Sequence, residues 1–403
     1  MIKCNKNLIA AAVVAAFALP IAAQAQSNVE MYGRLYPQVA SVSYSGASSV
    51  GSVVSTISGK ATGAADISQV TMDSPNSRLG FRGTENLGGG SNAFYQLEMG
   101  FGVDDGVLSS AGVLFARNTF VGVGSETYGS VKLGIMDTVY KELGDTNSIL
   151  GISSGNFMSV SNVLSKPGTG VSAGSFHLRR ANSIVYTSPK IANLTVLLDY
   201  SLGETAGSIS TGSVISTGAT YETGPIYLAL AYEQHNNMWG GSPSALSAAA
   251  VVGATSTDTA MRGTARYTIS SDTKVEVNVA NMKYKEEGGG IGKFSTYDHM
   301  AWAASFEQKL GAITLAGSYG SSAAGSCSVV GGGACNTNGL EGSMLNIAAG
   351  YSFSKRTMLY GVFTQITNGS SAVFSNAVNT VKVGKPAPGT DIGTFAIGLK
   401  HDF

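Results

Sequence analysis

The end of the chain constrains the fold more than any other segment. Residues Gly393–Phe403 alternate apolar and polar side chains, which an extended strand places on opposite faces. The apolar face comprises Phe395, Ile397, Leu399 and Phe403. Such a face suits a membrane, where unpaired backbone groups are costly, so both edges of the strand must pair with other strands. The segment therefore predicts a strand of a closed β-barrel.

The beginning of the chain has the features of a secretory signal peptide. Lys3 and Lys6 precede the apolar run Leu8–Leu19, and Ala23–Ala25 offers a small-x-small cleavage site. The apolar run is too short to cross a bilayer as a helix. We therefore expect residues 1–25 to be removed and residues 26–403 to form an exported barrel in a bacterial outer membrane.

The composition agrees with a barrel and argues against other classes. The chain has 53 glycines and only 12% charged residues, which is too apolar for a disordered protein and too rich in glycine for a helical one. No segment after the leader approaches the roughly 18 apolar residues of a transmembrane helix. Lys and Arg balance Asp and Glu at 25 each, so nothing indicates a nucleic-acid partner.

Short and long connections alternate along the chain. The short ones carry turn residues and lie near 84–90, 124–129, 188–190, 223–225, 270–272, 310–311 and 354–356. The long ones are rich in Gly, Ser and Asn and lie near 45–68, 104–112, 137–178, 204–216, 236–258, 285–296, 321–341 and 367–389. These fifteen connections join about sixteen strands, with both termini on the side of the short turns. The sequence therefore predicts an all-β fold, a transmembrane antiparallel up-and-down barrel.

Arginines alternate with apolar residues along several predicted strands, including Arg34, Arg78, Arg82, Arg262 and Arg266. An arginine that faces lipid costs about 2–4 kcal/mol at the bilayer midplane, so these side chains should point into the barrel. A barrel of about sixteen strands is too wide for side chains to fill, and the interior should hold a water channel.

Two cysteines remain after the leader is removed. Cys327 and Cys335 lie in a glycine-rich stretch of an exported chain, where we expect a disulfide that closes a surface loop. Two free thiols are an alternative. Half of a metal site is another, although no histidine or third cysteine is nearby, so no metal site is predicted.

An enzymatic barrel is the rival class. The acid–histidine neighbours are Asp298–His299 and His401–Asp402, and adjacent residues of a strand point to opposite faces. No nucleophile elbow or zinc-protease motif is present. We therefore predict no catalytic residues and no cofactor. A structural or adhesive barrel with a blocked lumen is a further alternative, which open-pore conductance would separate from a channel.

Five stretches, in order, resemble the trimeric general-diffusion porins of Gram-negative outer membranes, of the betaproteobacterial type. They are Met31–Arg34, Ser77–Gly90, Arg117–Gly124, Arg180–Tyr186 and Tyr351–Thr357, followed by the closing His401–Phe403. The resemblance implies a homotrimer in contact with outer-membrane lipid and lipopolysaccharide. It also implies that Phe403 signals to the barrel-assembly machinery, and that small hydrophilic solutes and anions diffuse passively through the pore.

In such porins the third long loop folds into the lumen, and basic residues of the wall face acidic residues of that loop. The loop corresponds to residues 137–178, with Glu142 and Asp145 as its acids. The basic wall maps onto Arg34, Arg78, Arg82, Arg117 and Arg180, with Arg179 adjacent. The usual Pro-Glu-Phe-Gly-Gly-like loop tip is replaced here by Leu150–Asn156. With fewer acids on the loop, we expect a mild preference for anions.

Several alternatives remain open at the level of sequence. A substrate-specific porin for anions or carboxylates fits the same residues. Glu30 could neutralise Arg34, and Asp137 could serve Lys132. Tyrosines of the predicted strands could form girdles at the membrane interfaces or, alternatively, a ladder that stacks on sugars. These tyrosines are Tyr32, Tyr36, Tyr186, Tyr200, Tyr221, Tyr227, Tyr232, Tyr284, Tyr319, Tyr351 and Tyr360.

Overall fold

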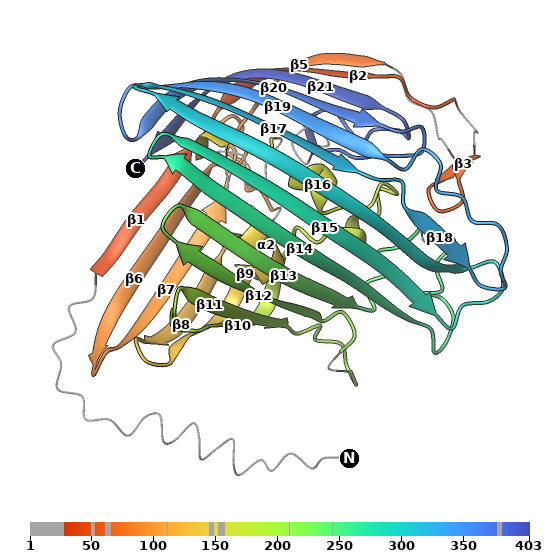
Figure 1. Cartoon of the computed structure of the whole chain (residues 1–403), viewed down its shortest axis with the longest axis horizontal. Coiled ribbons are helices and arrows are strands. Elements are labelled where there is room, and N and C mark those ends of the chain that lie inside the picture. Colours follow the sequence, from red (N-terminus) through yellow and green to blue (C-terminus); the bar gives the residue numbers. More distant parts are fainter. Residues whose placement is uncertain are drawn as a thin grey trace, which may run out of the picture.

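The computed structural model describes residues 28–49, 53–60, 66–110, 112–144, 149–151, 158–208, 210–243, 245–376 and 381–403. The predicted signal peptide lies outside the described residues. The described chain forms one large antiparallel sheet that closes on itself (Figure 1). The wall consists of β1 (Asn28–Leu35), β2 (Gln38–Ser45), β5 (Ile67–Asp73), β6 (Arg78–Gly88), β7 (Ser91–Gly100), β8 (Thr119–Ser125), β9 (Gly129–Asp137), β10 (Arg179–Thr187), β11 (Leu194–Ser201), β12 (Val214–Thr223), β13 (Ile226–Asn236), β14 (Thr255–Ser270), β15 (Thr273–Glu287), β16 (Phe294–Leu310), β17 (Ile313–Ser322), β19 (Gly342–Ser352), β20 (Thr357–Asn368) and β21 (Asp391–Asp402).

The sheet has nineteen strands by its hydrogen bonding, and these form sixteen wall strands. β1 continues into β2, β5 continues into β6, and the short β18 (Ser326–Val329) extends the wall beside β16. The barrel closes where β21 pairs with both β1 and β2, as in the registers Leu35↔His401 and Gln38↔Gly398. The predicted closed barrel of about sixteen strands is confirmed, with the terminal strand at the seam.

The connections fall at opposite ends of the barrel. The seven short turns lie at the end that holds the C-terminus, at the left of Figure 1. The eight long loops lie at the other end, beside β18 and the small hairpin of β3 (Val53–Ser55) and β4 (Gly59–Lys60). Cys327 and Cys335 form a disulfide within the seventh long loop.

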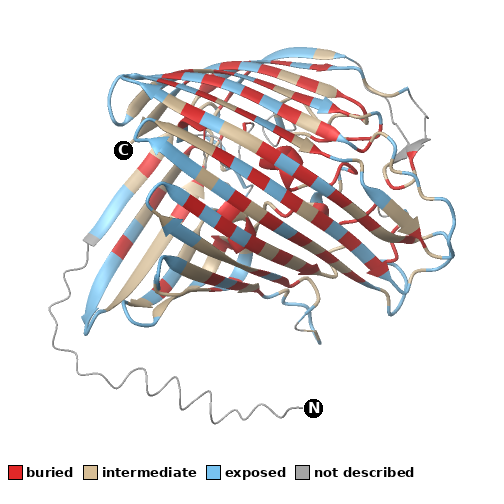
Figure 2. Ribbon diagram, in the orientation of Figure 1, coloured by how far each residue is buried: buried red, intermediate tan, exposed pale blue. Residues whose placement is uncertain are grey.

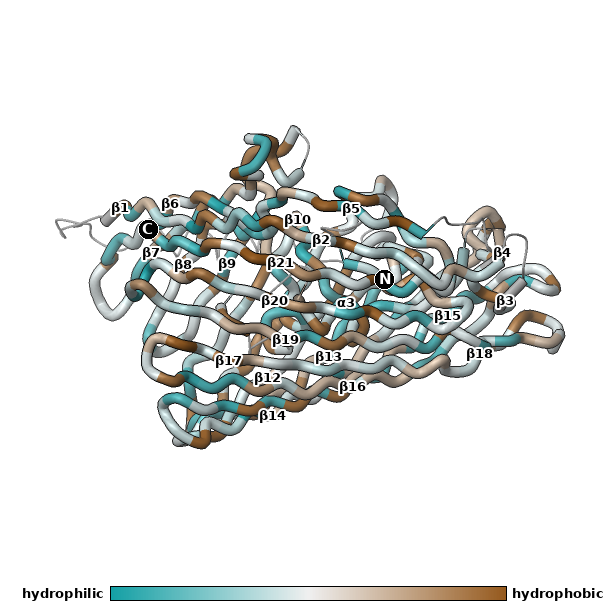
Figure 3. The backbone as a smooth tube through the Cα atoms, turned by 90° about the horizontal axis from the view of Figure 1, so that it is seen from above, coloured by the Kyte–Doolittle hydropathy of each residue, from teal (hydrophilic) through white to brown (hydrophobic). Residues whose placement is uncertain are grey.

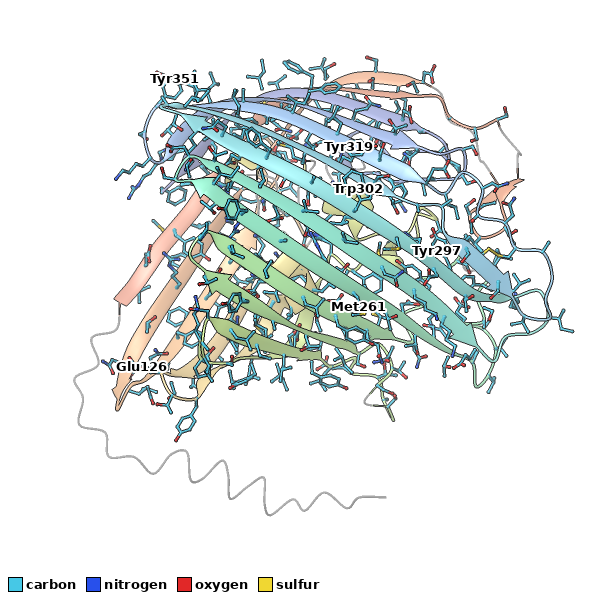
Figure 4. The ribbon with its side chains drawn as sticks, in the orientation of Figure 1. Glu126, Met261, Tyr297, Trp302, Tyr319 and Tyr351 are labelled. Carbon is cyan, nitrogen blue, oxygen red and sulfur yellow. A yellow bond between two sulfur atoms is a disulfide. The ribbon has the colours of Figure 1, made fainter. Side chains whose placement is uncertain are left out.

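Side chains alternate between the inside and the outside of the wall. In β2, Gln38, Ala40, Val42 and Tyr44 are buried inside, whereas Val39 between them is exposed. Figure 2 shows this alternation of buried and exposed residues along the strands, and Figure 3 shows the matching alternation of hydropathy. Figure 4 shows the outward residues Met261 on β14, Trp302 on β16 and Tyr319 on β17, each exposed by 41% or more. Apolar outward faces are what a bilayer requires.

The tyrosines divide between the two faces, so the girdle prediction is wrong for several of them. Tyr36, Tyr284 and Tyr360 are fully buried inside the barrel because their strand positions face inward. The rings of Tyr36 and Tyr360 pack edge to face, 5.1 Å apart. Buried rings of this kind also cannot form a ladder for sugars. Tyr319 and Tyr351 are exposed on the outer face, as a girdle requires.

The third long loop, L3 (residues 138–178), folds into the barrel. It contains α2 (Val139–Gly144), α3 (Ser161–Leu164) and the 3₁₀ turns η1 (Ile149–Gly151) and η2 (Ser172–Gly174). α2 contacts β11–β14, and it is visible behind β13 in Figure 1. η1 and α3 contact β16, β17 and β19. The described parts of L3 therefore line one side of the barrel interior.

Hydrogen bonds and apolar contacts attach L3 to the wall. The Tyr227 hydroxyl donates to the carbonyl of Leu143 over 3.1 Å, and the amide of buried Asn346 donates to the carbonyl of Met158 over 3.0 Å. Val139, Tyr140, Leu143, Leu164 and Phe176 pack against inward residues of the wall. The core of the molecule thus lies between L3 and the strands, and the remaining lumen lies on the other side of L3. None of the helices among the described residues is long and apolar enough to cross a membrane.

Candidate functional site

Three arginines come together, two from strands of the wall and one, Arg117, from the second long loop. Arg34 of β1 lies opposite Arg78 of β6 in the strand register. The backbone N–H of Arg117 donates to the carbonyl of Glu98, which places Arg117 beside the loop end of β7. The guanidinium of Arg78 is within electrostatic range of both Arg34 and Arg117. Three of the six basic residues predicted for the wall therefore form one cluster.

The carboxylate of Glu98 holds two of these arginines in place. Its Oε1 accepts a hydrogen bond from Nε of Arg117 over 2.5 Å, and its Oε2 lies 3.8 Å from Nε of Arg78. The Tyr32 hydroxyl donates to the same Oε2 over 3.0 Å. Glu98 is only 6% exposed, so this charge is held by its partners rather than by water.

The third arginine connects the wall to L3. Nε of Arg34 is 2.5 Å from Oδ1 of Asp402, on the terminal strand, and its Nη1 donates to the carbonyl of Gly151 over 2.5 Å. Lys400 lies beside this pair, 3.5 Å from Oδ2 of Asp402 and 3.4 Å from the carbonyl of Leu150. The described part of L3 thus meets the basic wall with backbone carbonyls rather than with acidic side chains.

Cationic groups outnumber anionic ones in this cluster. It contains four cationic side chains, Arg34, Arg78, Arg117 and Lys400, against three carboxylates: Glu98 and Asp402, which pair with them, and Glu307, whose charge acts on Lys400. Sequence reasoning missed Glu98, Asp402 and Lys400 as members of the site. Lys400 and Asp402 could have been found, because closure of the barrel brings the polar face of the last strand beside the first.

Two predicted basic residues lie apart from the cluster. Arg82 makes a bidentate pair with Glu30, with two distances of 2.8 Å, and both side chains are more than half exposed. The alternative pairing of Glu30 with Arg34 is therefore wrong, because the register places Glu30 opposite Arg82. Nη2 of Arg180 donates to the carbonyl of Gly212 in the fourth long loop, over 2.8 Å.

A second charged cluster lies at the base of L3. Asp137 is 2.7 Å from Nζ of Lys141 and 2.9 Å from Nη2 of Arg179, whose Nε donates to Oδ1 of Asn118 over 2.9 Å. The pairing of Asp137 with Lys132 that the sequence left open does not form, because these two cations take the carboxylate instead.

Of the two predicted acids of the loop, Glu142 is separated from the arginine cluster. Glu142 is exposed, and the charges that act on it are those of Lys132 and Asp137. Asp145 lies outside the described residues. The carboxylates that pair with Arg34, Arg78 and Arg117 therefore come from the wall itself, which the sequence pattern did not reveal.

Comparisons with known proteins place this barrel in a family. A family model described as Gram-negative porin matches residues 10–371. This chain belongs to the Gram-negative porins. The porin is 29% identical to Outer membrane porin protein 32 of Delftia acidovorans over 99% of its own length and 100% of that relative. It is 31% identical to Major outer membrane protein P.IB of Neisseria meningitidis serogroup B, over 52% of the porin and 53% of that relative.

Solved structures share the fold of the porin. The anion-selective porin from Comamonas acidovorans superposes with a TM-score of 0.68 at 20% identity, covering 94% of the porin and 100% of that chain. The trimer form of OmpT from Vibrio cholerae gives a TM-score of 0.60 at 15% identity, covering 94% and 99%. Because it belongs to the Gram-negative porins, the porin is an integral protein of the outer membrane, and it forms a channel for passive diffusion rather than an enzyme.

Proposed function

We propose that this porin passes small hydrophilic solutes and ions with a mild preference for anions, and that Arg34, Arg78 and Arg117 dominate its constriction. The observation that carries the proposal is the excess of cationic side chains over carboxylates in the cluster formed by Arg34, Arg78, Arg117 and Lys400. Charges along a low-dielectric wall focus their field into the lumen and raise the local concentration of counter-ions. Guanidinium groups keep their charge at any physiological pH.

The paired carboxylates set the strength of this preference. Glu98 and Asp402 each neutralise part of the arginine charge, so the field favours anions without holding them tightly. Weak binding is what diffusion requires, because a solute must leave as readily as it enters. The description of the Comamonas acidovorans relative as anion-selective agrees with this assignment.

We further infer that the porin assembles as a homotrimer in outer-membrane lipid and lipopolysaccharide. The outer faces of β1, β8 and β21 expose apolar side chains such as Val29, Met31, Val121 and Phe395. One structural neighbour is a trimer form. Phe403 ends the strand at the seam, where it is accessible to the barrel-assembly machinery, and its backbone pairs with that of Gly33 over 3.1 Å.

Planar-bilayer recordings test the proposal. The zero-current potential of the refolded porin under a KCl gradient should have the sign of chloride selectivity, and openings should come in steps of three. Changing Arg34 and Arg117 to glutamine should shift the potential toward cation selectivity. Changing the exposed, ion-paired Lys190 of a short turn to glutamine removes the same charge and should leave the potential unchanged. A cation-selective wild-type channel would overturn the role assigned to these arginines.

A further inference from the structure

A cavity of about 660 Å³ lies between L3 and the eighth long loop, L8 (residues 369–390). The two loops are joined where the N–H of Val373 donates to the carbonyl of Gly168 over 3.0 Å. Gly170 has a φ of +72°, and its backbone packs against the side chain of Val373 so closely that a Cβ would overlap it. The two loops therefore pack closely against each other beside the cavity. Its volume is in the range that small-molecule sites commonly have.

Cationic side chains line this cavity, and no carboxylate lines it. They are Lys141, Lys166, Arg179 and Lys385, with His177 beside them. The carboxylate of Asp137 pairs with Lys141 and Arg179 and offsets part of their positive charge. Lys166 and Lys385 have no carboxylate partner among the described residues.

Lys166 holds the two loops together and keeps capacity for a further partner. Its Nζ donates to Oδ1 of Asn162 over 2.9 Å, and it lies 3.4 Å from the carbonyl of Ser375 in L8. An ammonium group has three N–H donors, so one remains for a ligand. Both present partners are neutral, and an anion would supply the charge that they lack.

The remaining lining is partly apolar and partly polar. Pro167 and Val171 of L3 lie across the cavity from Val373, Val381 and Pro386 of L8, and serines and asparagines of both loops complete the lining. Inorganic phosphate could use the cations but would leave the apolar surface in contact with water. A neutral sugar could hydrogen-bond to the serines and asparagines but would use neither the charge of the lysines nor the apolar surface.

We propose that this cavity binds small monocarboxylates with an apolar body, such as benzoate. Lys166 and Lys385 would receive the carboxylate through charge-assisted hydrogen bonds, while the apolar body packs against Val171, Val373 and Pro386. This inference rests on the proposed anion channel and adds a solute class to it. Solutes held at the loop end of the lumen would enter the constriction at a raised local concentration.

Binding at this site should depend on pH. Burial lowers the pKa of Lys166 to about 8, and the charged groups that face the cavity, Lys141, His177 and Arg179 near L3 and Lys385 on L8, are all basic. Lys166 binds an anion in its charged form, and that form is lost as pH rises through about 8. Affinity for a carboxylate should therefore be higher at pH 7 than at pH 9.

The test is ligand-induced interruption of the KCl current in planar bilayers, with benzoate, acetate and phosphate added on the loop side. The concentration of benzoate that gives half of the maximal current interruption should be at least about fivefold below that of acetate or phosphate. In the Lys166→Gln/Lys385→Gln variant, the half-saturating concentration of benzoate should rise about tenfold. Val171→Ser should raise the half-saturating concentration of benzoate and leave that of acetate unchanged. Lys285→Gln, outside the barrel in an exposed pair with Glu287, is the matched control.

Chloride selectivity and channel conductance are measured on the same channels, which shows that each variant is folded and separates this inference from the proposed function. Benzoate that binds no more tightly than acetate, or a double variant with unchanged benzoate affinity, would overturn the monocarboxylate site while chloride selectivity persists. A wild-type channel without chloride selectivity would overturn the proposed function instead.

Discussion

At the scale of single residues, the pore is defined as much by its carboxylates as by its arginines. Each arginine of the constriction cluster has a carboxylate within 3.8 Å, and Glu98 serves two of them. The inward direction of Arg34 and Arg78 could be predicted from strand alternation. Glu98, the partner of Arg78 and Arg117, could not be predicted, because it meets them only through the pairing of β6 with β7 and the fold of the second long loop.

Removing the charge of Glu98 should make the channel more selective for anions. In Glu98→Gln, Arg117 and Arg78 keep a neutral acceptor of the same shape but lose the charge that offsets theirs. The zero-current potential under a KCl gradient should move toward the chloride equilibrium potential. Glu222→Gln removes an exposed carboxylate paired with Lys190 at a short turn and should leave the potential as it is. An unchanged potential in Glu98→Gln would show that the constriction field arises elsewhere.

At the scale of elements, strands and turns could be predicted, whereas the structure of L3 could not. Turn residues such as Thr223–Pro225 carry a local signal, and all seven short connections occur where the sequence places them. α2 and α3 are too short to be stable alone, and they form because the wall contacts them. The resemblance assigns Arg180 to the basic row, whereas its side chain bonds to the fourth long loop, beside a register shift between Arg180 and Ser183 that the residue pattern does not reveal.

The attachment of L3 should depend on Asn346. Its amide is fully buried and donates to the carbonyl of Met158 and to Oγ of Ser318, over 3.0 and 2.8 Å. Asn346→Ala removes both of these hydrogen bonds, including the one between L3 and the wall, at a cost of about 1–3 kcal/mol. We expect more open-channel current noise from a loosened loop, with the mean conductance shifted. Gln365→Ala on the following strand is the control, since the amide of Gln365 donates to the carbonyl of Ile366 and not to L3. Its open-channel current noise should equal that of the wild type.

At the scale of the whole molecule, the barrel depends on the seam between its first and last strands. Closure could be predicted from the alternation that ends the chain, and the registers of β21 with β1 and β2 confirm it. The fit at the seam could not be predicted. Gly33 lies beneath the ring of Phe403, and a Cβ there would overlap the ring and approach the carbonyl oxygen of Arg78 to 2.7 Å.

A methyl group at this seam should destabilise the barrel. We expect Gly33→Ala to lower the thermal unfolding midpoint, because overpacking a tight contact typically costs about 1–3 kcal/mol. Gly361→Ala in β20 is the matched control, since a Cβ there would meet nothing within 4 Å. The midpoints are measured by circular dichroism during heating. Equal midpoints for the two variants would mean that the ring of Phe403 moves aside without a loss of stability.

The pairing of β21 with β1 and β2 also fixes when the molecule can become a pore. The strand that completes the wall pairs with one from the other end of the described barrel, as in the register Gln38↔Gly398. Contacts this distant in sequence form slowly, so we expect closure to be a late step of folding. A barrel without β21 has two unpaired edges and stays open, so the water-filled lumen exists only once these distant strands have met.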